Sequence, residues 1–146
     1  MLIGKNGRIC GTVGGGNAEY ESEQYARMLL EQSPSGQQEF TMTGVDAEKS
    51  GMICGGSLTV YFNYIPAGDA ETIKLADRAA HYFAADTALW LFIAFGGSMS
   101  LYTKQDGFIG APCPDTLLEK LPRMSKTAEV DGITYHFEQI NDPGKV

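Results

Sequence analysis

The run Leu58-Thr59-Val60-Tyr61-Phe62-Asn63-Tyr64-Ile65 predicts a β-strand more clearly than any other stretch of the chain, because β-branched and aromatic residues fill it. Pro66-Ala67-Gly68 ends that strand. A helix is then expected from Asp69 to Ala84. One face of this helix is marked at helical spacing by Ile73, Ala76, Ala80 and Phe83. This strand and helix form the middle of the predicted fold.

Working outward, hairpins and further helices flank this middle part. Downstream, the sequence predicts a buried strand over Thr87–Phe95 and a hairpin over Met99–Ile109. A short helix capped by Asp115 is expected over Asp115–Met124, and a last strand over Thr134–Gln139. Upstream, it predicts a hairpin over Met1–Val13 with its turn at Lys5-Asn6-Gly7-Arg8, and a helix over Ala18–Gln32 with Asn17 as N-cap. A strand over Gln38–Thr43 and a loop over Asp46–Gly56 follow. Strands, helices and hairpins in this order predict an α+β (mixed α/β) class, with a mixed β-sheet and helices packed on it.

Composition limits the classes of function. At 146 residues the chain has the size of one ordinary domain. Its net charge of −7 argues against nucleic acid or an anionic membrane as the main partner. No long apolar run or signal-peptide layout is present, and three cysteines without CxxC spacing favour reduced thiols. We therefore expect a cytoplasmic protein without a disulfide framework or a zinc site.

Two glycine clusters are the main candidates for function: Gly11-Thr12-Val13-Gly14-Gly15-Gly16-Asn17-Ala18-Glu19 and Gly51-Met52-Ile53-Cys54-Gly55-Gly56-Ser57. The first lies between a predicted strand and a predicted helix, where free N–H groups and small residues favour a phosphate. It lacks the third glycine of a dinucleotide fingerprint and the GK[ST] ending of a P-loop. A tight turn without a ligand remains the alternative. If the cluster is only a turn, Glu19 is a first-turn acid that stabilises the helix. If the cluster binds a ligand, Glu19 is an acceptor for the ligand's amino or hydroxyl groups.

Cys54-Gly55-Gly56 is the candidate in the second cluster. A cysteine in such a loop is a thiolate ligand or sulfur carrier when its pKa is lowered, and an inert core residue otherwise. For Cys10 and Cys113 we favour structural roles. His81 and His136 have no metal-ligand spacing to another His, Cys or acid, so no metal site and no catalytic residue is predicted.

Taken together, Gly4 to Glu19 and Met52 to Val60 resemble the XdhC/CoxI family, the accessory proteins of xanthine dehydrogenase and related molybdenum hydroxylases. The resemblance implies binding of the molybdenum cofactor (molybdopterin), a phosphate-bearing pterin dithiolene, and delivery of its sulfurated form to an apo-hydroxylase. Matched by position, the cofactor-binding residues would be Gly14, Gly15, Gly16, Asn17, Glu19, Cys54, Gly55 and Gly56. Many family members have a cysteine where this chain has Asn17, so Cys54 would act alone.

The resemblance also implies an organisation and partners. Residues 1–140 would form a family-like domain, and 141–146 the start of a linker to an absent second domain. Expected partners are the apo-hydroxylase, a sulfurase and a second copy of the chain, because an unpaired strand edge at Met1 would recruit one. Two other classes stay open: an enzyme, either a nucleotide-dependent oxidoreductase or a sulfurtransferase using Cys54, and a subunit that only makes interactions.

Overall fold

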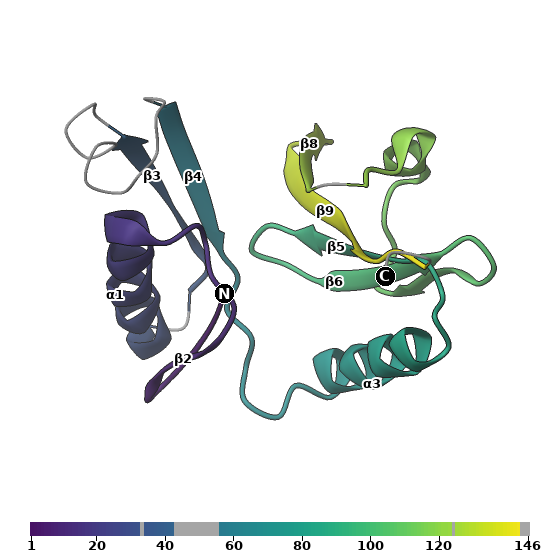
Figure 1. The fold of residues 1–146 in the computed structure, drawn as a ribbon, viewed down its shortest axis with the longest axis horizontal. Coiled ribbons are helices and arrows are strands. Elements are labelled where there is room, and N and C mark those ends of the chain that lie inside the picture. The colour runs from purple at the N-terminus through teal and green to yellow at the C-terminus, as the bar shows by residue number, and fades with distance from the viewer. Residues whose placement is uncertain (33, 43–55, 124, 144–146) are drawn as a thin grey trace. The chain divides into compact units, whose positions relative to one another are not determined.

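The computed structural model describes residues 1–32, 34–42, 56–123 and 125–143 (Figure 1). The chain divides into two compact units, Met1–Tyr64 (unit 1) and Ile65–Val146 (unit 2). Helices occur with sheets in both units, and every strand pair in the described part is antiparallel. The α+β class is therefore confirmed. The predicted family-like domain over residues 1–140 stays a prediction.

Unit 1 contains a helix and two hairpin sheets. Its elements are β1 (Leu2–Gly4), β2 (Gly7–Cys10), α1 (Gly16–Gln32), β3 (Gly36–Met42) and β4 (Gly56–Phe62). The turn between β1 and β2 and the end of α1 at Gln32 are confirmed. β2 ends three residues before the predicted end at Val13, because Gly11 adopts a left-handed φ of +78° and turns the chain away from its partner strand.

The apolar face of α1 packs against β3 and β4. Leu29, Phe40 and Val60 are buried, and the ring of Tyr25 meets that of Phe62 edge-on at a centroid distance of 5.0 Å. A Cβ added at Gly36 would lie 3.0 Å from Leu29 Cδ1, so the start of β3 approaches the second half of α1 closely. Burial of these side chains holds the helix on the hairpin.

The predicted N-cap of α1 is wrong. The helix begins at Gly16, so Asn17 lies inside its first turn and its Nδ2 donates to Glu21 Oε1 at 2.6 Å. The preceding glycines turn the chain into the helix, and Glu19 accepts hydrogen bonds from the residues just before it. Asn17 is therefore not needed as the cap.

Unit 2 is a five-stranded antiparallel sheet with two helices. Its elements are α3 (Ala70–Ala84), β5 (Leu89–Ala94), β6 (Met99–Thr103), β7 (Gly107–Gly110), the 3-10 helix η1 (Asp115–Lys120), β8 (Lys126–Val130) and β9 (Ile133–Asn141). The strand order is β7-β6-β5-β9-β8. The sequence did not predict β8. The predicted helix over Asp115–Met124 is shorter and of 3-10 type, and its N-cap is Pro114 rather than Asp115.

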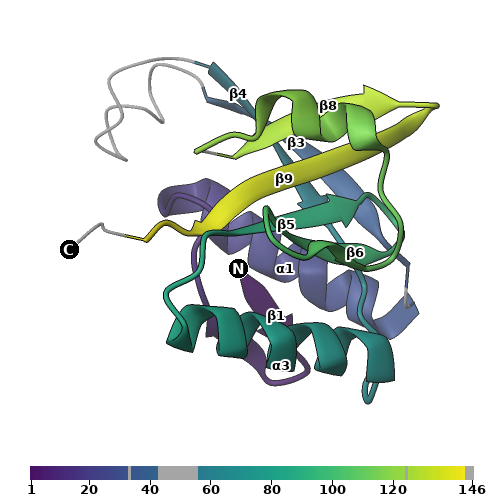
Figure 2. The same ribbon diagram turned by 90° about the vertical axis from the view of Figure 1, so that its right-hand side faces the viewer.

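Side chains of β5 alternate between two apolar clusters, because successive residues of a strand point to opposite faces. Leu89 packs with Leu75, Tyr82 and Leu101, on the α3 side. Trp90 and Phe92 pack on the other side, and their buried partners there are Leu117, Tyr135 and Phe137. Figure 2 shows α3 and η1 on opposite sides of the sheet. The predicted buried strand in this stretch is thus confirmed.

The predicted apolar face of α3 is wrong. Ile73 and Phe83 are 53% and 48% exposed, whereas Leu75 and Tyr82 are buried. Two apolar rows run along this helix, and the row with Leu75 and Tyr82 contacts the sheet. The start of the helix agrees with the prediction, since Asp69 Oδ2 accepts from the Thr72 N–H at 2.8 Å.

Candidate functional site

The first glycine cluster forms the entry to α1. Gly14, Gly15 and Gly16 have φ values of +122°, +80° and +66°, which side-chain-bearing residues rarely adopt. A Cβ added at Gly14 or Gly15 would meet no atom within 4 Å. These glycines are therefore required by the backbone conformation rather than by crowding, and the space beside Gly14 and Gly15 is open to a ligand.

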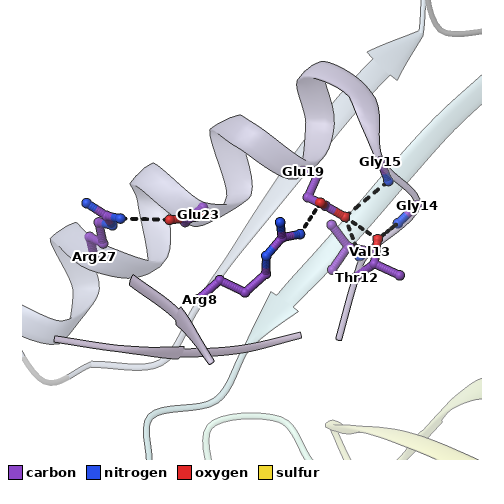
Figure 3. Close-up of polar contacts among 8 residues, drawn as sticks. All are labelled: Arg8, Thr12, Val13, Gly14, Gly15, Glu19, Glu23 and Arg27. Carbon is purple, nitrogen blue, oxygen red and sulfur yellow. Dashed lines mark hydrogen bonds and ion pairs between the residues drawn. The ribbon is translucent and has the colours of Figure 1, made fainter. Parts of the chain in front are cut away.

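The carboxylate of Glu19 turns back onto this loop (Figure 3). Its Oε2 accepts from the N–H groups of Val13 at 3.3 Å and Gly15 at 3.2 Å, and from the Thr12 hydroxyl. Its Oε1 pairs with the guanidinium of Arg8 on β2. One side chain thus connects the hairpin, the glycine loop and the first turn of α1.

These contacts determine the charge of Glu19. The hydrogen bond from Thr12 lowers the pKa of the carboxyl below its ordinary value of 4.5, and the Arg8 guanidinium lowers it further. The carboxylate is therefore ionised at neutral pH. The loop already binds one anion, which belongs to its own chain.

A phosphate would meet a loop whose donors are partly used. The N–H groups of Val13 and Gly15 donate to Glu19, and that of Gly14 donates to Thr12 Oγ1 at 3.1 Å. The first N–H groups of an α-helix have no acceptor within the helix, so those of Gly16 and the residues after it remain for a ligand. This donor set fits a phosphate oxygen at the start of α1. Glu19 already accepts four hydrogen bonds and has little capacity left for a pterin.

The second glycine cluster is described only at its end. Cys54 and Gly55 lie outside the described residues. Gly56 is the first residue of β4 and pairs with Met42 of β3. The described parts of both glycine clusters therefore belong to unit 1.

The remaining cysteines and the histidines belong to β2 or to unit 2. Cys10 ends β2 and is exposed, so it is not part of a core. Cys113 is half-buried, its Sγ lies 3.4 Å from Ser100 Oγ, and burial raises the pKa of its thiol. His81 lies in α3 and His136 in β9, as predicted. Within the described ranges, no three His, Cys, Asp or Glu side chains gather closely enough to hold a metal ion.

Arg8 and Thr12 are the site residues that sequence reasoning missed. The sequence places Arg8 only in the predicted hairpin, where the turn meets the second strand, although its side chain reaches Glu19, eleven positions away in the chain. The available signal was the hairpin itself, which returns the chain past the start of α1. A cation on β2 and an acid in the first turn of α1 are then close enough to pair.

Comparison of the chain with protein-family models, curated proteins and solved structures finds no match. None of the helices in the described part has both the length and the apolar character that a bilayer crossing requires.

Proposed function

We propose that the chain is an accessory protein of the XdhC/CoxI type, which binds the molybdenum cofactor and assists its sulfuration and insertion into a xanthine dehydrogenase-type hydroxylase. One observation supports this most: Gly14, Gly15 and Gly16 all have a positive φ, and the space beside Gly14 and Gly15 is open. Such a loop lets a phosphate approach the main chain closely. The proposal places the protein in the cytoplasm as a non-catalytic carrier.

Three parts of unit 1 have roles in this proposal. The N–H groups at the start of α1 would hold the phosphate. Glu19, tied to Arg8 and Thr12, would keep the loop in its binding conformation. By the resemblance, Cys54 would lie near the molybdenum or its sulfur. When bound, the cofactor supplies the molybdenum centre that the apo-hydroxylase needs.

A subunit that only makes interactions is the second candidate. Its support is the Glu19 carboxylate, which already satisfies the N–H groups of Val13 and Gly15 without any ligand. In that case the glycines serve only the turn into α1, and unit 1 binds no pterin.

Cofactor retention tests the proposal. The protein is purified from cells with and without the enzymes of cofactor synthesis, and the pterin released by oxidation is measured by fluorescence. We expect pterin only from the first preparation and none from the Gly15→Val variant. The matched control is Gly132→Val in unit 2, since Gly132 also has a positive φ, +75°, and open space around it.

Three results would count against the proposal. Pterin at background level in the wild-type protein would leave the interaction subunit as the better candidate. Retention by Gly15→Val equal to that of the wild type would remove the glycine loop from the site. Loss of folded structure in Gly15→Val, seen by far-UV circular dichroism, would support a purely structural role for that glycine.

A further inference from the structure

A cavity of about 410 Å³ lies in unit 2, between α3 and the edge strand β7. Glu71, Lys74, Leu75, Asp77 and Arg78 line it from α3, and Ile109 and Gly110 line it from β7. Its volume falls in the range of small-molecule sites, which extends from about 300 to 1,000 Å³. The proposed role of the glycine loops in unit 1 does not involve it.

The floor of the cavity is apolar. Leu75 is buried and Ile109 is half-buried. At Gly110 the φ is +100°, and an added Cβ would lie 2.8 Å from Leu75 Cδ2. The absence of a side chain there lets β7 approach α3 and leaves the floor to the two aliphatic side chains. An apolar body of a ligand would be desolvated on this floor.

Arg78 is the cation best placed to orient a ligand. Its Nη2 donates to Tyr82 Oη at 3.2 Å, and its guanidinium carbon lies 5.5 Å from the centre of the Tyr82 ring. Tyr82 is buried, and its hydroxyl donates to Asp106 Oδ2 at 2.6 Å. The phenol therefore fixes the guanidinium without neutralising it.

The other charges on the wall restrict the ligand further. Lys74 is paired with Glu71 at 2.6 Å, whereas no ion pair among the described residues includes Arg78 or Asp77. One carboxylate on Arg78 would complete a charge-assisted pair. A second negative charge would be repelled by the unpaired Asp77. The wall thus favours one negative charge over two.

We propose that this cavity binds a small monocarboxylate with an apolar chain, its carboxylate on Arg78 and its chain on Leu75 and Ile109. The eight helical residues from Glu71 to Arg78 are separated by seven rises of about 1.5 Å, or about 10 Å in all, which suits a chain of about eight carbons. Octanoate is therefore the probe of choice.

The test titrates the full-length protein with octanoate, using calorimetry for affinity and amide chemical shifts of Leu75 and Ile109 for location. We expect saturable binding that shifts both amides. Arg78→Gln should weaken it about tenfold or more, because a charge-assisted hydrogen bond is lost. Arg123→Gln is the matched control, since Arg123 is exposed in the same unit and does not line the cavity, and it should leave binding unchanged.

Ligand analogues test the charge preference on the wild-type protein without any variant. Octylamine and the eight-carbon dicarboxylate should each bind more weakly than octanoate, by about tenfold or more. Asp77→Asn should reduce the difference in affinity between the dicarboxylate and octanoate, because it removes the charge that repels the second carboxylate. Absence of octanoate binding would overturn the proposal. Equal affinity for octylamine, or an Arg78→Gln variant that folds and binds like the wild type, would do the same. None of these outcomes depends on whether unit 1 binds a pterin.

Discussion

Replacing Gly15 by alanine isolates the energetic role of the glycine loop. The added Cβ meets no atom within 4 Å, and alanine keeps the N–H that donates to Glu19 Oε2. The substitution therefore changes the free energy of unfolding only through the backbone conformation. An L-residue in the left-handed region, here at φ +80°, costs about 1–2 kcal/mol, and the lower freedom of alanine in the unfolded chain returns about 0.4–1 kcal/mol. We expect a net destabilisation of about 1 kcal/mol.

Urea unfolding measures this difference. With a slope of about 1–2 kcal/mol per M, the midpoint of unit 1 should fall by roughly 0.5–1 M. Far-UV circular dichroism and hydrogen exchange of β4 amides report on this unit. Gly97→Ala is the control, because its added Cβ would make ordinary contacts of 3.6 Å and its φ lies outside the left-handed range. A Gly15→Ala midpoint equal to the wild-type midpoint would refute the left-handed conformation of the loop.

Further predictions concern both units. Thr12→Val and Arg8→Gln should each raise the pKa of the Glu19 carboxyl, because each removes an interaction that lowers it, and a carboxyl NMR titration that shows no rise in either variant would contradict the contacts. Since the pKa of Glu19 in the folded protein lies below 4.5, the stability that Glu19 contributes is fully present above pH 4.5 and is lost as the pH falls through the folded pKa. In Glu19→Gln the urea midpoint should therefore fall less steeply over this pH range than in the wild type. An identical pH profile in the two proteins would contradict this contribution. Phe92→Ala should destabilise unit 2 by about 3–5 kcal/mol, seen in the fluorescence of the single tryptophan, because Phe92 is fully buried; a loss below about 2 kcal/mol would contradict the packing. Ser22→Ala should stabilise unit 1 by about 1 kcal/mol, because its buried hydroxyl has no partner in the described part of the chain, and a lower thermal midpoint would show that the hydroxyl is bonded.

Local sequence patterns predicted most of the elements. Glycine turns mark the hairpins, and the continuous apolar run over Thr87–Phe95 predicts a buried strand without knowledge of distant residues. β8 was missed because Lys126–Val130 contains little apolar character and becomes a strand only by pairing with β9. The face of α3 was mistaken because two apolar rows fit the helical period, and the sheet selects the row with Leu75 and Tyr82.

For the candidate site, the sequence predicted the backbone conformation of the loop but not the side-chain contacts around it. Three consecutive glycines indicate a left-handed loop, and the structure has it. The role of Glu19 as a clamp depends on Arg8 and Thr12, which approach it only after the hairpin has formed. The cavity beside Gly110 depends on the packing of α3 against the sheet, so no short sequence pattern predicts it.

The place of β5 in the sheet bears on how unit 2 folds. On one side it pairs with β6, its nearest neighbour along the chain. On the other it pairs with β9, where Phe92 lies opposite Phe137, 45 positions later. The ring stack between these two phenylalanines, with centroids 5.1 Å apart, forms only after that long loop has closed. High contact order of this kind slows folding, so β5 with its two apolar faces stays exposed to wrong partners until β9 arrives.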